Sequence, residues 1–162
     1  MNTRWMTPLL AAIVTIGLTA PVSAQTFTLT ATLTGAEETP APGLNTGAFG
    51  NATVVVNMAT RTVTWTVDVF NFPSGVTAAH IHVGAAGTAG PVVVNFTVPT
   101  TASNDFRIAG SATDAEFTLR PEQGIRSGDD MFQAILGGNS YVNVHSAVNR
   151  GGEIRGQLTL RP

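Results

Sequence analysis

The sequence predicts an all-β protein, a Greek-key β-sandwich or barrel of roughly eight strands with one short helix. Apolar and polar residues alternate through most segments, which is typical of half-buried strands. Turns that contain glycine or proline separate these segments at short intervals, and only one segment has a helical pattern. The composition agrees with this class, because the chain is rich in valine, threonine and glycine and only 11% of its residues are charged.

Two segments show the alternation most clearly. Residues 26–34 alternate between threonine and an apolar residue, and residues 62–69 do the same around Trp65, which we expect in the core. Residues 35–47 and 71–77 contain proline and glycine and are expected to be loops. The further strands are expected at residues 52–58, 79–83, 92–98, 106–111, 116–119, 141–145 and 153–160.

Ser127 begins the only expected helix. Its hydroxyl can cap the first turn, Asp130 follows three residues later, and Gly137 ends the helix after about two turns. Asp129 and Asp130 are expected to complement the positive end of the helix dipole.

Residues 1–24 are predicted to be a secretory signal peptide. Arg4 precedes an apolar run over residues 8–18, and Val22, Ser23 and Ala24 form a small-residue cleavage site. The apolar run is short for a bilayer span, so no membrane insertion is expected after cleavage. The mature chain, residues 25–162, is then exported to the periplasm or the cell exterior, and its length suits one domain.

The charge and the cysteine content exclude several classes of partner and chemistry. Without Arg4 the mature chain has seven arginines, no lysine and ten acidic residues, a net charge of −3 with neutral histidines. A mildly acidic protein attracts neither nucleic acid nor an anionic membrane surface. No cysteine is present, which excludes disulfides and thiolate metal ligands. The expected partner is an extracellular or envelope protein or ligand.

All three histidines lie in two expected strands. His80 and His82 share one face of residues 79–83, because residues two apart in a strand point the same way. The apolar residues between and after them are expected to face the core, which sends both histidines outward.

The same reasoning applies to the last two strands. It places Tyr141, Asn143 and His145 on an outer face, and likewise Glu153 and Arg155. Leu160 is expected to face the core. If these strands are neighbours, the polar residues form one group, roofed by the loops at residues 35–47 and 84–90.

Five short segments occur together in one known family. They are LTGAEE at residues 33–38, AHIH at 79–82, GPVV at 90–93, YVNVH at 141–145 and GGEIRGQ at 151–157. In combination they resemble the chordin-type (CHRD) domain, and the resemblance covers nearly the whole mature chain. It implies an extracellular module of the β-sandwich type and no defined activity.

A second, weaker similarity concerns the histidines. A histidine pair two residues apart, a valine-rich stretch ending in histidine, and a late segment with asparagine, glycine and arginine also occur in copper/zinc superoxide dismutases. The similarity implies that His80, His82 and His145 stand where copper ligands would lie, with Arg155 near the arginine that guides superoxide. The bridging histidine, the zinc ligands and the disulfide cysteines of that family have no counterparts here.

Three imidazoles from two strands suit copper or zinc and leave one coordination position open. The sequence therefore predicts a copper or zinc site at the three histidines. Water or a fourth donor would fill the open position, and the candidates are Glu37, Glu38, Tyr141 and Glu153. In the alternative interpretation the histidines bind no metal, and they hydrogen-bond to one another's strands and to Asn143.

Arg155 is expected to pair bidentately with Glu37 or Glu38, which would tie the first loop to the last strand. A substrate-binding role for Arg155 is the alternative.

These observations predict an exported binding module with a bound copper or zinc ion. Two alternatives stay open: a small copper redox enzyme that acts on superoxide or peroxide, and a structural or adhesive module without metal. No serine lies in a nucleophile setting and no glycine-rich phosphate loop is present, so no catalytic residue is assigned.

Overall fold

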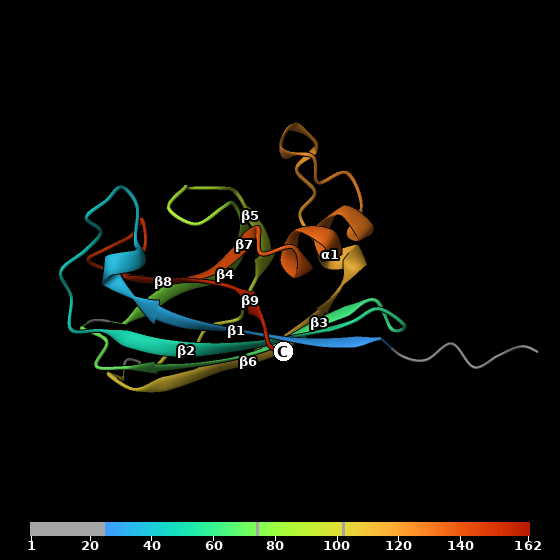
Figure 1. Cartoon of the computed structure of the whole chain (residues 1–162). Coiled ribbons are helices and arrows are strands. Elements are labelled where there is room, and N and C mark those ends of the chain that lie inside the picture. Colours follow the sequence, from blue (N-terminus) through green and yellow to red (C-terminus); the bar gives the residue numbers. More distant parts are fainter. Residues whose placement is uncertain (1–24, 74, 102) are drawn as a thin grey trace, which may run out of the picture.

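The computed structural model describes residues 25–162 except Ser74 and Ala102, so the expected signal peptide lies outside the described residues. Within the described part the chain is mostly β, with a single short α-helix, which confirms the predicted fold class (Figure 1). The strands are β1 (Thr26–Thr34), β2 (Phe49–Asn57), β3 (Thr62–Phe70), β4 (Val76–Val83), β5 (Val92–Asn95), β6 (Phe106–Thr113), β7 (Ser140–Ser146), β8 (Ile154–Gln157) and β9 (Thr159–Leu160). The helix is α1 (Gly128–Leu136), and the 3-10 turns are η1 (Gly35–Glu37), η2 (Asp114–Glu116) and η3 (Pro121–Gln123).

Eight strands form one nearly closed, barrel-like sheet in the order β5-β4-β7-β8-β1-β2-β3-β6, and β9 pairs with β1. All pairs are antiparallel. The chain runs through β1, β2 and β3 as successive neighbours, whereas β4 lies between β5 and β7. This crossover places both histidine-bearing strands, β4 and β7, side by side.

The core contains the apolar residues that the alternation predicted. Val63, Val67 and Val69 of β3 are fully buried, and Trp65 is 4% exposed. The Trp65 ring stacks on Phe96 with 4.3 Å between ring centroids. The predicted core position of Trp65 is therefore confirmed.

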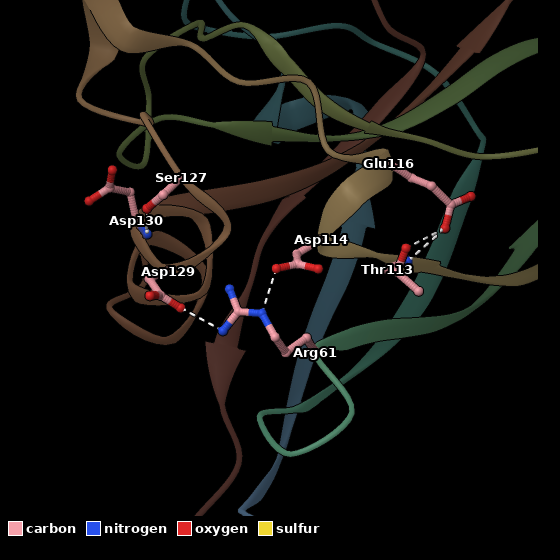
Figure 2. Close-up of polar contacts among 7 residues, drawn as sticks. All are labelled: Arg61, Thr113, Asp114, Glu116, Ser127, Asp129 and Asp130. Carbon is pink, nitrogen blue, oxygen red and sulfur yellow. Dashed lines mark hydrogen bonds and ion pairs between the residues drawn. The ribbon is translucent and has the colours of Figure 1, made fainter.

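The helix begins where the sequence predicts. The backbone N–H of Asp130 donates to the Ser127 hydroxyl at 3.2 Å, so Ser127 is the N-cap. Arg61, in the turn between β2 and β3, pairs with Asp114 and with Asp129 in the first turn of α1 (Figure 2). The pair with Asp129 links the helix to this turn, but because Asp129 is 71% exposed it contributes little to stability.

Two expected strands differ from the structure. Residues 116–119 form no strand, because the Glu116 carboxylate accepts hydrogen bonds from the backbone N–H and the hydroxyl of Thr113 and closes the 3-10 turn η2 (Figure 2). The expected strand at residues 153–160 is interrupted at Leu158, which separates β8 from β9. β8 lies between β7 and β1, whereas β9 pairs with β1 alone. Leu160, expected in the core, is 48% exposed in this last strand.

The face of β7 that was expected to be exposed is buried. Every residue of this strand is buried, on both faces of the sheet. The apolar face packs on the core, and the polar face lies under the loops that join other strands. The polar side chains expected at the surface are therefore enclosed.

None of the helices in the described part of the chain is long and apolar enough to cross a membrane.

Candidate metal centre

The pairing of β4 with β7 assembles the histidines. His80 lies opposite Asn143, His82 opposite Tyr141, and His145 opposite Ala78. Directly opposite residues of an antiparallel pair share a face, so the three imidazoles lie together on the polar face. The other face carries Ile81, Val142 and Val144, which are fully buried in the core.

The three imidazoles are close enough to share one ion. One ring nitrogen from each of His80, His82 and His145 lies within 4.8 Å of the others. The shortest contact joins His80 Nδ1 to His145 Nε2 at 3.1 Å. Among the described residues, this is the one group of three or more histidine or acidic side chains with such spacing.

Backbone carbonyls fix two of the rings. His82 Nδ1 lies 2.9 Å from the Gly90 carbonyl, and His145 Nδ1 lies 2.9 Å from the Arg150 carbonyl. A carbonyl oxygen only accepts, so each Nδ1 carries the proton and each Nε2 has a lone pair. The lone pair of His145 Nε2 accepts the hydrogen bond from His80 Nδ1. His82 Nε2 is buried and has no hydrogen-bond partner in the described structure.

The site keeps its histidines neutral. Burial, together with the positive charges that His145 and His82 would carry, lowers the pKa of His80 to about 4. Burial also lowers the pKa of His82 and His145, against the opposing effect of their hydrogen bonds to backbone carbonyls. A neutral imidazole is the form that binds metal.

This donor set fits a copper or zinc ion. It provides three neutral nitrogens, two of them with the opposite nitrogen bonded to a carbonyl, which is the usual outer-shell arrangement of metal-binding histidines. The buried, unpaired Nε2 of His82 is the observation that favours an ion, because a buried polar atom without a partner is costly.

Arg155 does not form the expected ion pair with Glu37 or Glu38, and that prediction is wrong. The guanidinium is 2% exposed and lies over the Tyr141 ring, 3.4 Å from its centroid. It donates to the Thr88 carbonyl at 2.8 Å. Its other amino group donates to the Thr39 hydroxyl of the first loop at 3.4 Å, so Arg155 joins the two loops without an ion pair.

Glu38 is buried, whereas Glu37 is exposed on the same turn. Asn143 donates to Glu38 Oε2 at 3.5 Å, and Glu38 Oε1 has no partner within the described chain. Burial raises the pKa of Glu38 to about 7, and the nearby Arg155 charge only partly offsets this effect. Gly152 covers this carboxyl, because a Cβ at that position would lie 2.4 Å from Glu38 Oε1.

Glu153 has a structural position. It is fully buried and accepts hydrogen bonds from Thr46, Ser146 and Asn149. Burial raises its pKa, but the three hydrogen bonds outweigh that effect and hold the pKa below its usual value. The carboxylate therefore ties the first loop to the turn after β7 and is not free to be a fourth ligand.

The sequence did not indicate the two carbonyl acceptors, those of Gly90 and Arg150. Backbone oxygens have no side-chain signal, so only the fold reveals which of them face a histidine. Gly90 has one indirect signal, because a Cβ there would lie 1.7 Å from the Val83 carbonyl oxygen and only glycine fits. Of the two loops expected over the site, the first reaches Glu153 through Thr46, and the second reaches Arg155 and His82 through the carbonyls of Thr88 and Gly90.

The fold and the site together define a small all-β module with a cluster of three histidines, two of them buried and His80 partly buried. A family model, the CHRD domain, matches residues 29–158, which is most of the chain. The chain belongs to the CHRD domain family. No curated protein and no solved structure matches it.

Proposed function

We propose that this CHRD-domain protein is an exported binding module that holds one copper or zinc ion at His80, His82 and His145. The proposal depends mainly on the Nε2 atom of His82. This atom is buried and has no hydrogen-bond partner in the described structure, and the bond from Nδ1–H to the Gly90 carbonyl leaves its lone pair free. The close approach of the three ring nitrogens and the lowered histidine pKa values support it.

The proposed location is the periplasm or the cell exterior. The amino-terminal pattern of charge, apolar run and small residues supports export. The partner would be an extracellular or envelope protein or ligand, which the mildly acidic charge favours over nucleic acid.

Calorimetric titration tests the metal site. Residues 25–162, purified without an affinity tag and stripped of metal, should bind one equivalent of copper(II) or zinc(II). His80→Gln and His145→Gln should each weaken binding by at least about tenfold, since each removes one of three ligands. Glu122→Gln, which changes an exposed acid on η3, is the control and should bind as the wild type does.

Measurements on the same purified protein distinguish the binding module from a copper redox enzyme and from a metal-free structural module. If the wild type takes up neither metal at micromolar concentrations, the site fails and the histidines are structural. If the copper-loaded protein consumes superoxide or peroxide much faster than the metal-free protein, the chain is a copper redox enzyme. Stoichiometric binding without turnover identifies a binding module.

A further inference from the structure

Tyr141 is joined to the histidine cluster through a single backbone residue. The Gly90 N–H donates to the Tyr141 hydroxyl at 2.9 Å, and this hydroxyl donates to the Gly90 carbonyl at 3.3 Å. The same carbonyl accepts the Nδ1–H of His82 at 2.9 Å. The Tyr141 hydroxyl therefore bonds both the N–H and the carbonyl of Gly90, the residue that orients His82.

The Tyr141 ring is itself held between two neighbours. His82 stacks on it with 4.8 Å between centroids and an interplanar angle of 10°, and the Arg155 guanidinium lies over it at 3.4 Å. These residues come from β4 and β8, the strands on either side of β7. Arg155 also donates to the Thr88 carbonyl, two residues before Gly90. The loop and the ring are thus fixed together.

The position of Gly90 leaves little freedom to the carbonyl. A Cβ on Gly90 would lie 1.7 Å from the Val83 carbonyl oxygen, so the loop backbone lies directly against the end of β4. Tyr141 is 2% exposed, so water does not compete for its hydroxyl. Close packing limits where the loop backbone can lie, and the Tyr141 hydroxyl bonds both polar groups of Gly90 within that position.

We propose that Tyr141 is a positioning residue of the histidine site. Through the Gly90 carbonyl it maintains the Nδ1–H tautomer of His82, so that Nε2 stays directed at the ion. The effect on metal affinity rests on the proposed function, whereas the effect on the His82 tautomer does not. Tyr141 is then not a fourth ligand, because its hydroxyl is committed to Gly90.

The variant that tests this role is Tyr141→Phe, which keeps the stacked ring and removes only the hydroxyl. We expect copper(II) affinity to fall by about 10–100-fold, the usual effect of losing an outer-shell partner. The copper(II) electron paramagnetic resonance spectrum should change as well, because the His82 ring would no longer be held in one orientation.

Gln157→Leu is the matched control. Gln157 Nε2 donates to the Gly84 and Gly138 carbonyls at 3.0 and 2.8 Å, so this variant also removes two hydrogen bonds, one of them to the other end of the same loop. It leaves the bonds at Gly90 in place. Its copper affinity and spectrum should match those of the wild type. Equal losses in both variants would show general loosening of the loop and overturn the proposal.

Nitrogen-15 NMR of the His82 ring in metal-free protein gives a readout that needs no metal. The wild type should show the Nδ1–H tautomer and Tyr141→Phe a mixture of both tautomers. A wild type in the Nε2–H tautomer would overturn the proposal even if the variant did not fold. The proposal would also be overturned if Tyr141→Phe kept the His82 tautomer, the copper(II) affinity and the resonance spectrum of the wild type. If the wild type binds no metal yet the tautomer shifts in the variant, the proposed function fails and the positioning role stands.

Discussion

His80 Nδ1 lies 3.1 Å from His145 Nε2, although 65 positions separate the two residues in the chain. The contact exists because β4 and β7 are neighbours in the sheet, with His145 opposite Ala78, two residues from His80. Burial and the neighbouring imidazoles lower the pKa of His80 to about 4, so the pair stays uncharged through the physiological range. An uncharged pair at this distance can share an ion.

Metal binding should persist in mild acid. Protons compete with the metal for each imidazole only near its pKa, and the pKa values of all three histidines lie below the ordinary 6.5. We expect zinc affinity, measured by competition with a chromophoric chelator, to fall less between pH 7.5 and 5.5 than it does for histidines with the ordinary pKa. The zinc affinity of a short unfolded peptide with the His-Ile-His sequence should fall by roughly tenfold per histidine for each pH unit below 6.5. A protein that loses affinity in step with the peptide would contradict the lowered pKa values.

The metal-free protein should lose stability in the same acid range. The folded pKa of each histidine is below its unfolded value of 6.5, so the unfolded chain binds protons first as the pH falls. The stabilising contribution is complete above pH 6.5 and is lost as the pH falls toward the folded values, about 4 for His80. Urea unfolding between pH 7.5 and 4.5 measures this dependence. His80→Gln should have a shallower dependence than the wild type, and equal slopes would contradict the expectation.

Glu38 should have the opposite pH dependence. Its folded pKa of about 7 is above the unfolded 4.5, so its stabilising contribution is complete below pH 4.5 and is lost as the pH rises through 7. Glu38→Gln stays neutral, so its stability relative to the wild type should improve between pH 5 and pH 8 in urea unfolding. Glu37→Gln alters the exposed neighbour and should show no such change. A constant difference between Glu38→Gln and the wild type at both pH values would show that Glu38 titrates normally.

Trp65→Ala should cost about 3–5 kcal/mol in the free energy of unfolding, because it removes a buried large aromatic and its stack on Phe96. Phe49→Ala is the control. Phe49 also stacks on an aromatic neighbour, Phe70, but it is 48% exposed, and its removal should cost less than about 1 kcal/mol. Chemical unfolding monitored by circular dichroism compares the two. Similar losses would mean that burial does not distinguish these rings.

Local sequence patterns predicted most of the strands and the helix. The exceptions arise where hydrogen bonds or strand pairing that the pattern does not show decide the structure. The alternation around Trp65 and the Ser127 cap depend on residues within one turn or strand, and both are found where expected. The expected strand at residues 116–119 failed because Thr113 and Glu116 close a 3-10 turn. The strand at 153–160 divided at Leu158, where pairing with β7 ends and only pairing with β1 continues.

The candidate site was only partly predictable. The sequence indicated the three histidines and the shared face of His80 and His82, since side-chain direction alternates along any strand. It did not indicate the Gly90 and Arg150 carbonyls that orient two of the rings. It also suggested a carboxylate partner for Arg155, which instead lies on Tyr141.

By itself, the sequence determined the all-β class, the alternation of faces and the histidine residues that one face carries, because these properties depend on neighbouring residues within a strand. Only the tertiary structure decided that the polar face is enclosed, that His145 contacts His80, and which backbone oxygens hold the rings. Those features depend on strand order and on where the loops pack, and both result from contacts between residues far apart in the chain. Burial then changes the chemistry of the site, since it raises the pKa of Glu38 and lowers that of His80.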